Sequence, residues 1–283
     1  MCELFAMSSR IPTSVSFSLE RLARRGGAEG LHRDGWGVAF YEGRDAFLLR
    51  EPLAASESEL VRYIEHHGPP SELVISHIRE ATFGERALRN TQPFVRELGG
   101  HTHVFAHNGD LSGIERQEDF IPERFRPVGD TDSELAFCSL LDRLAALWEG
   151  ARDRLPPLED RLEMVNDFAA ALRPMGPANF LYADGDTLFV HAHMRTQADG
   201  RKAPPGLHVL ERACRESPAQ LAGSGVSLTT VHQSLLLVAS VPLTDESWRP
   251  MTEGEVLAIS AGRLVKSRVP APTGSRQAGE GGA

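Results

Sequence analysis

The chain has 283 residues, of which 41% are hydrophobic and 24% are charged, a composition typical of a globular protein with a sizeable core. These values exclude a chain that is disordered throughout, a collagen and a small disulfide-stapled scaffold. With 30 Lys and Arg against 39 Asp and Glu the formal net charge is -9, so a polyanion meets a repulsive average field and nucleic acid is not expected as a partner.

The cysteines and the first residues indicate the compartment. Cys2, Cys138 and Cys214 are an odd number without a CxxC pair, which favours a reducing environment over a disulfide framework or a structural zinc site. The N-terminal segment carries Glu3 and no long apolar run, so neither a signal peptide nor a membrane anchor is expected. We therefore predict a cytoplasmic protein without a membrane partner.

Short runs rich in β-branched and aromatic residues recur along the chain and predict strands. The runs are 37–41, 46–49, 73–78, 103–107, 179–182, 187–191, 235–239 and 256–259. Asp184-Gly185 lies between two of them and Ala261-Gly262 follows another, and both dipeptides suit hairpin turns because their residues tolerate positive φ. The strands are therefore expected to pair antiparallel.

Two segments have apolar residues at helical spacing. In one, Asp132 or Ser133 could act as N-cap. The apolar stripes of the two helices are Phe137, Leu140, Leu141, Leu144, Leu147 and Trp148, and Leu158, Leu162, Val165, Phe168 and Leu172. Helices of this kind cover a sheet face, so the pattern predicts a layered α+β fold.

One domain is favoured, because no linker rich in Pro, Gly and Ser divides the chain before residue 265. Residues 266–283 have almost nothing apolar to bury and are expected to form a disordered C-terminal tail. The predicted organisation is a domain of residues 2–265 followed by this tail.

Cys2 directly follows the initiator Met1. Because cysteine is small, the aminopeptidase that trims initiator methionines should remove Met1 and expose the α-amino group of Cys2. The reference pKa values of a thiol and an α-amine are roughly 8.5 and about 7.7 to 8.0, so this amine can accept the thiol proton near neutrality. Taken alone the signal is weak, because a buried cysteine usually behaves as a small hydrophobe.

Four further segments support a nucleophilic role for Cys2 by their order and spacing along the chain. They are His-Arg-Asp-Gly-Trp-Gly-Val-Ala at 32–39, Ser-His-Ile-Arg-Glu-Ala-Thr-Phe-Gly at 76–84, Ala-His-Asn-Gly-Asp at 106–110 and Gly-Asp-Thr-Asp-Ser-Glu at 129–134. Together with the opening Met-Cys-Glu-Leu-Phe-Ala-Met-Ser, the chain resembles the class II, N-terminal-nucleophile glutamine amidotransferases, in their stand-alone YafJ-type subgroup. The resemblance runs from Cys2 to about Leu264.

The resemblance implies an Ntn-hydrolase fold, a four-layer αββα sandwich with two antiparallel sheets and Cys2 at the end of the first strand. It also implies that Cys2 attacks the side-chain amide carbon of glutamine. The oxyanion that forms would be bound by the side-chain amide of Asn108 and the backbone N–H of Gly109.

The substrate-binding residues are implied in the same way. Arg79 would hold the α-carboxylate of glutamine, because a guanidinium can bond both carboxylate oxygens at once. Asp132 would receive the α-ammonium group, and Thr82 would add a hydroxyl contact. Without the surrounding motifs, Arg79 and Asp132 would instead be read as solvated or structural charges.

Two positions depart from the family. Synthase-linked members carry Trp-Ala-Thr-His after the arginine, where this chain has Glu80-Ala-Thr-Phe83, and a histidine is usual where this chain has Gln92. Neither position is the nucleophile or an oxyanion donor, so the departures bear on substrate preference. Asp34-Gly-Trp-Gly37 is expected to shape the site through close backbone passage.

Other candidate sites are weaker. His101/His103 and His191/His193 are i,i+2 pairs that could share a strand face, but no third ligand is evident and no metal site is predicted. Cys138 and Cys214 are expected to be inert thiols. No phosphate-binding glycine motif is present, so no ATP or dinucleotide cofactor is predicted.

Three functions remain open. The first is a stand-alone hydrolase that releases ammonia or an amine from glutamine or another γ-glutamyl compound through a Cys2 thioester. The second is a glutaminase subunit that is active only with a separate ammonia-accepting synthase. The third is a non-catalytic glutamine-binding module, which the retained nucleophile and oxyanion donors disfavour.

Overall fold

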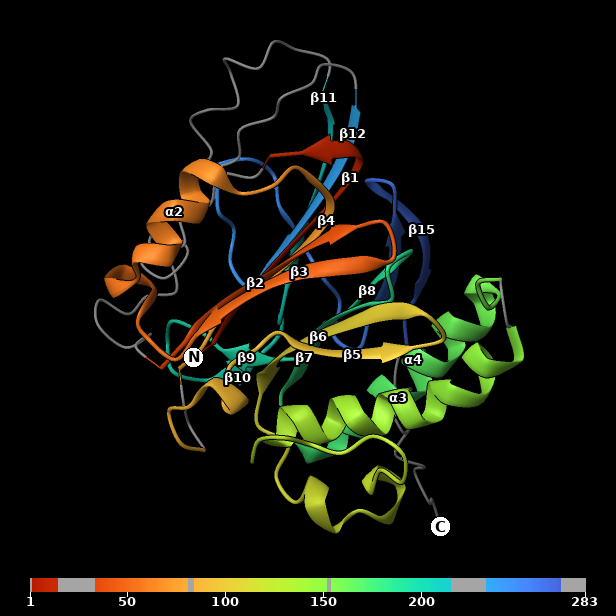
Figure 1. The fold of residues 1–283 in the computed structure, drawn as a ribbon. Helices are drawn as coiled ribbons and strands as arrows, with labels where there is room; N and C mark the ends of the chain where they lie inside the picture. The colour runs from red at the N-terminus through yellow and green to blue at the C-terminus, as the bar shows by residue number, and fades with distance from the viewer. Residues whose placement is uncertain (1, 15–33, 81–83, 152–153, 215–232, 271–283) are drawn as a thin grey trace, which may run out of the picture.

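The computed structural model describes residues 2–14, 34–80, 84–151, 154–214 and 233–270 (Figure 1). Most of these residues belong to two antiparallel sheets. The seven-stranded sheet has the order β13 (Arg249–Pro250), β11 (His208–Cys214), β12 (Gln233–Ala239), β1 (Glu3–Thr13), β4 (Ser71–Ile78), β2 (Trp36–Glu42) and β3 (Asp45–Glu51). The six-stranded sheet has the order β15 (Arg263–Arg268), β14 (Val256–Ser260), β8 (Leu188–His191), β7 (Ala178–Ala183), β6 (His101–Gly109) and β5 (Phe94–Leu98).

The remaining elements are short strands and helices. β9 (Arg195–Thr196) and β10 (Lys202–Ala203) form a separate two-stranded sheet. The α-helices of the described ranges are α2 (Glu59–His67), α3 (Asp132–Ala151) and α4 (Leu158–Leu172). Single 3-10 turns lie at Ala55–Glu57, Leu88–Asn90, Ile114–Arg116, Glu118–Phe120 and Arg173–Met175. Within the described ranges, no helix is long and apolar enough to cross a membrane.

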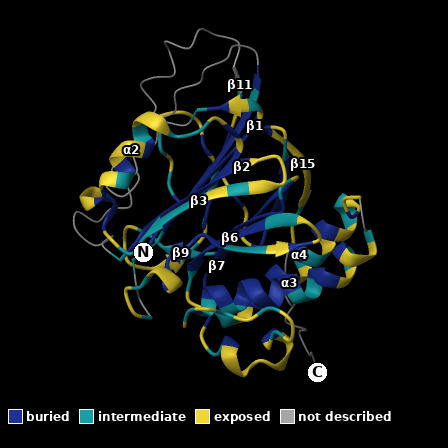
Figure 2. Cartoon of the chain, viewed as in Figure 1, coloured by how far each residue is buried: buried dark blue, intermediate teal, exposed yellow. Residues whose placement is uncertain are grey.

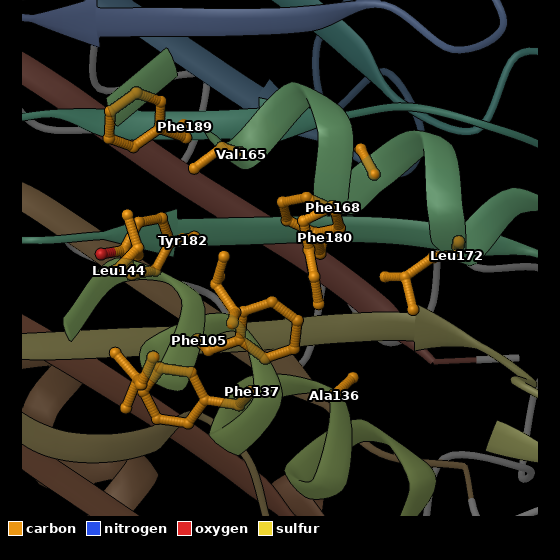
Figure 3. Packing of buried hydrophobic residues seen from close by; sticks show 14 of the residues in the cluster. Phe105, Ala136, Phe137, Leu144, Val165, Phe168, Leu172, Phe180, Tyr182 and Phe189 are labelled. Carbon is orange, nitrogen blue, oxygen red and sulfur yellow. The ribbon is translucent and has the colours of Figure 1, made fainter. Parts of the chain in front are cut away.

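Three apolar layers hold these elements together. Helices α3 and α4 pack on the six-stranded sheet, where Figure 3 shows Phe137, Phe168 and Phe180 from both sides of that contact. A second layer joins the inner faces of the two sheets, and a third packs α2 against the outer face of the seven-stranded sheet. Figure 2 shows that the strands inside the sandwich are almost wholly buried, whereas α2 and α4 have exposed outer sides. The fold is the expected αββα sandwich.

Strand β1 contributes to two of these layers, because successive side chains on a strand point to opposite faces. Leu4 and Ala6 belong to the layer between the sheets, and Phe5 and Met7 to the outer layer with α2. With both faces covered, the start of β1 is a continuous apolar run without alternation.

The strands and both helices predicted from the sequence are confirmed, as are the two hairpin turns. Gly185, Ala261 and Gly262 have φ values of 87°, 48° and 71°. The predicted N-cap of α3 is wrong. The helix begins at Asp132, and the hydroxyl of the preceding Thr131 accepts a hydrogen bond from the Glu134 N–H, at 3.2 Å.

The sequence patterns did not identify β1, β5, β11, β15, α2 or the two-residue strands β9, β10 and β13. β15 runs through Arg268, so the paired strand crosses the predicted domain boundary at residue 265. Residues 271–283 of the predicted tail lie outside the described residues.

Candidate active site

Strand register brings the ends of three strands together around Cys2. Ile78, the last residue of β4, pairs with Glu3 of β1 on one side and with Trp36 of β2 on the other. Cys2 and Arg79, the neighbours of Glu3 and Ile78, therefore emerge at the same edge of the sheet. The N–H of Arg79 donates to the Gly35 carbonyl at 2.8 Å, which extends this pairing into the Asp-Gly-Trp-Gly segment.

The thiol of Cys2 lies against the backbone of Glu80. Its Sγ is 3.3 Å from both the Glu80 carbonyl oxygen, to which the thiol donates, and the Glu80 nitrogen, whose N–H it accepts. Burial raises the pKa of the Cys2 thiol to about 12, while the nearby Arg79 guanidinium acts to lower it and Asp132 to raise it. In the chain with Met1 attached, this thiol stays protonated at neutral pH and needs a base to become a nucleophile.

Asn108 reaches Cys2 from the other sheet. It lies at the end of β6, is 1% exposed, and donates from Nδ2 to the Cys2 carbonyl oxygen at 2.5 Å. The next residue, Gly109, passes so close to β7 that an added Cβ would overlap the Pro177 carbonyl oxygen. Only glycine fits there, as expected for a backbone that must approach closely.

Arg79 is 4% exposed and its guanidinium is held by main-chain carbonyls. Nη1 donates to the oxygens of Asp34 and Glu85 at 3.4 and 3.3 Å, and Nη2 donates to that of Gly84 at 3.2 Å. These main-chain acceptors orient the side chain.

Asp132 lies at the first turn of α3, where its carboxylate accepts from the backbone N–H groups of Leu111 and Ser133, both at 2.7 Å. Gly84 lies between Arg79 and Thr131, the residue before Asp132: an added Cβ at Gly84 would lie 3.4 Å from Arg79 Nη2 and 3.5 Å from Thr131 Cγ2. Arg79 and Asp132 also both act on the pKa of Cys2. The structure therefore gathers Cys2, Asn108, Gly109, Arg79 and Asp132 at one place.

A cavity of about 610 Å³ borders Asp132. It is lined by residues 110–115, 129–132, Pro127 and Leu135. Residues 81–83 lie outside the described ranges, so the predicted Thr82 contact and the Phe83 departure have no structural description.

The glycines of the Asp-Gly-Trp-Gly segment allow the close backbone passage that was predicted for it. Gly35 has a φ of 139°, and an added Cβ would lie 3.1 Å from Thr91 Oγ1. An added Cβ at Gly37 would overlap the Gln92 carbonyl oxygen. Trp36 is fully buried in the outer layer of the core. The two glycines let β2 pass close to the segment that carries Gln92.

Several buried polar residues that support the site were not predicted. Glu3 pairs with Arg195 at 3.0 Å, and Arg195 also donates to the Ser240 carbonyl at 2.6 Å, which anchors the chain directly after Cys2. Burial raises the pKa of Glu3, and Arg195 acts to lower it. Asn179 donates to the Asn108 carbonyl at 3.1 Å. Two sequence features could have pointed to these supporting residues: Glu3 is an acidic residue next to Cys2, and Asn179 is a polar residue inside an apolar strand.

The histidine pairs serve other hydrogen bonds. His103 bonds the Tyr182 hydroxyl at 2.7 Å, and His191 and His193 bond the carbonyls of Glu255 and Gly176 at 3.2 and 3.1 Å. Among the described residues, no group of three or more His, Cys, Asp or Glu side chains could hold a metal ion. Cys138 is buried in α3, and burial raises the pKa of its thiol to about 11.

The chain is similar to known proteins in sequence and in structure. Residues 1–280 match the family model for class II glutamine amidotransferases. YafJ of Escherichia coli is 36% identical over 94% of this chain and 100% of its own length. A crystal structure of a predicted glutamine amidotransferase from Pseudomonas aeruginosa is 35% identical, covers 94% of this chain and all of that one, and superposes with a TM-score of 0.66.

A more distant structure supports the fold alone. Glutamine phosphoribosylpyrophosphate amidotransferase from B. subtilis is 16% identical, with a TM-score of 0.56 over 94% of this chain and 49% of that one. The matched family model, the full-length relative and the shared two-sheet architecture all lead to one assignment. The chain belongs to the class II glutamine amidotransferases.

Proposed function

We propose that this chain is an amide hydrolase that cleaves glutamine or another γ-glutamyl compound through a thioester on Cys2. The observation that carries the proposal is the hydrogen bond from Asn108 Nδ2 to the Cys2 backbone, which brings an amide donor of one sheet to the predicted nucleophile of the other. This arrangement supplies a nucleophile and an oxyanion donor within one buried site.

The buried thiol requires a base, and removal of Met1 would provide one. The freed α-amine of Cys2 takes the Sγ proton as sulfur bonds to the amide carbon of the substrate. The amide oxygen becomes an oxyanion that accepts hydrogen bonds from Asn108 Nδ2 and the Gly109 N–H. The α-ammonium then protonates the leaving nitrogen as the C–N bond breaks, which leaves a γ-glutamyl thioester.

Hydrolysis of the thioester completes the cycle. The α-amine of Cys2 takes a proton from water as the water oxygen attacks the thioester carbon, and sulfur leaves with that proton. The products are glutamate and ammonia, or glutamate and an amine when the substrate is a larger γ-glutamyl amide.

Two charged side chains are proposed to bind the α-carboxylate and α-ammonium groups of the substrate. The Arg79 guanidinium would bind the α-carboxylate and the Asp132 carboxylate the α-ammonium. Both charges already have main-chain partners, so they are oriented before the substrate arrives. This preorganisation supports the roles proposed for them.

The test is product formation by the purified protein. Wild type and Cys2→Ala are incubated with glutamine, γ-glutamyl dipeptides and glutathione, and free glutamate is measured. We expect glutamate from at least one substrate with wild type and none with Cys2→Ala. Turnover that appears only after a cell extract is added would favour the partner-dependent glutaminase, and equal turnover by Cys2→Ala would contradict the proposal.

A further inference from the structure

The edge of β6 next to Asn108 lacks a backbone partner from β5. The two strands pair from Leu98–His101 to Phe94–Phe105, and the same register continued by two residues would place Gln92 opposite His107. Backbone pairing stops at Phe94, shortly before the site begins.

The side chain of Gln92 takes the place of the missing peptide. Its Oε1 accepts from the His107 N–H at 2.6 Å, and its Nε2 donates to the His107 carbonyl at 3.2 Å. Gln92 is 5% exposed, so these bonds are shielded from water. A side-chain amide carries the same donor and acceptor as a backbone peptide and can imitate a strand partner.

The main chain around Gln92 is held from the opposite sheet. The Gln92 carbonyl packs on Gly37 of β2, where no Cβ could be accommodated. Arg50 of β3 donates from Nη1 to the carbonyls of Thr91 and Pro93, at 2.8 and 3.4 Å. Gln92 is thus fixed to the seven-stranded sheet by its backbone and to the six-stranded sheet by its side chain.

These contacts fix the backbone of β6 that carries Asn108 and so the direction of the Asn108 side chain. The His107 carbonyl bonded by Gln92 belongs to the peptide that leads into Asn108, and the Asn108 carbonyl is bonded by Asn179 from β7. The peptides before and after the Asn108 Cα are therefore held from the two sides of β6. Rotation of either peptide would swing the Asn108 side chain away from Cys2.

We propose that Gln92 is a positioning residue of the oxyanion hole: its amide clamps the His107 backbone and so aims Asn108 at the reacting carbonyl. This inference rests on the proposed function. It gives a physical role to a position at which the sequence departs from the histidine usual in the family. A neutral imidazole has its donor and acceptor on different sides of the ring and cannot bond the N–H and C=O of one residue together.

The test is Gln92→Met, which keeps the length of the side chain and removes both hydrogen bonds. We expect kcat for glutamate release to fall by about tenfold to a hundredfold, the range expected when a catalytic group is displaced by up to 1 Å. KM should change little, because the hydrogen bonds that the substitution removes go to the His107 backbone and not to the proposed substrate-binding charges. The rate of Cys2 alkylation by iodoacetamide should also stay unchanged, since that reaction forms no oxyanion.

Gln233→Met is the matched control. Gln233 is 3% exposed, and its amide likewise bonds a neighbouring strand, accepting from the Ile11 N–H at 3.3 Å and donating to Thr13 Oγ1 at 2.8 Å. It braces the far end of β1, away from Cys2. We expect Gln233→Met to lower the melting temperature as Gln92→Met does but to retain the wild-type kcat.

Gln92→Glu serves if the methionine variant does not fold. A glutamate can accept from the His107 N–H but can donate to the His107 carbonyl only when protonated, so the ratio of its kcat to that of wild type should rise as the pH falls toward 5. A wild-type kcat in Gln92→Met, or a parallel fall in kcat and in Cys2 alkylation, would overturn the inference. Absence of turnover in wild type would instead contradict the proposed function.

Discussion

The oxyanion role proposed for Asn108 can be tested apart from substrate binding with a single substitution. Its Nδ2 faces Cys2, whereas the charges proposed to read the substrate head belong to Arg79 and Asp132. Asn108→Ala should therefore lower kcat by about 10²- to 10³-fold, the loss typical of one oxyanion donor, with little change in KM. Steady-state kinetics of glutamate release measure both constants.

A suitable control is Asn166→Ala, at a partly buried position on α4, the helix that packs with α3 on the outer face of the six-stranded sheet. This variant should keep wild-type kinetics. If Asn108→Ala instead raised KM and left kcat unchanged, Asn108 would be a binding residue and the oxyanion role would be wrong.

The residues at the site differ in how far sequence could identify them. Cys2, Arg79, Asn108 and Asp132 were predicted because each lies in a motif whose order along the chain is distinctive. Asn179 and Arg195 stand alone in sequence and acquire partners only when β7 and β9 fold against β6 and β1. No local pattern carries that information.

At the scale of elements, the first turn of α3 carries both a helix cap and Asp132, the residue proposed to bind the substrate α-ammonium. The Thr131 hydroxyl accepts from the Glu134 N–H, and Asp132 follows it directly. Thr131→Ala should lower the free energy of unfolding by about 1 kcal/mol, as loss of an N-cap does, and should raise KM because Asp132 is less firmly placed. Urea denaturation and glutamine kinetics measure the two effects.

Ser58→Ala is the matched control on another helix. The Ser58 hydroxyl caps α2 by accepting from the Val61 N–H at 3.0 Å, and α2 lies on the outer face of the seven-stranded sheet. A comparable loss of stability with an unchanged KM is expected. Equal KM values in wild type, Thr131→Ala and Ser58→Ala would mean that the start of α3 does not position the substrate.

Three of the elements that the sequence patterns missed have few buried side chains. In β15 the side chains are almost all exposed, so RLVKSR shows no apolar face. β5 has only Phe94 and Leu98 buried at its ends. α2 has two buried residues, Val61 and Ile64, which give a stripe too short to recognise. The predicted strands and the two long helices carry apolar runs or stripes that were recognisable in the sequence. Burial alone did not suffice, because β1 is buried on both faces at its start and was not identified by its pattern.

At the scale of the whole molecule, buried histidines link stability to pH. Burial lowers the pKa of His103 to about 4 and that of His191 to about 3. The unfolded chain, in which these groups titrate near 6.5, binds more protons than the folded chain at pH values below about 6.5. Stability should therefore fall on acidification from pH 6.5 toward pH 4, by up to about 1.4 kcal/mol per pH unit for each histidine.

Urea denaturation of wild type and His191→Asn across this range isolates one histidine. The stability difference between the two proteins should narrow as the pH falls, because the variant lacks the group that must stay neutral. A difference that is constant from pH 7 to pH 4.5 would mean that His191 is protonated in the folded protein.

The most direct test of the mechanism is the intact mass of the purified protein before and after treatment with diazo-oxo-norleucine, an electrophilic glutamine analogue. We predict a chain that lacks Met1 and gains a single adduct, mapped to Cys2 and absent in Cys2→Ala. Full glutamine turnover by a chain that retains Met1, or an adduct on Cys138 or Cys214 that persists in Cys2→Ala, would contradict the assignment of Cys2 as a nucleophile activated by its own amine.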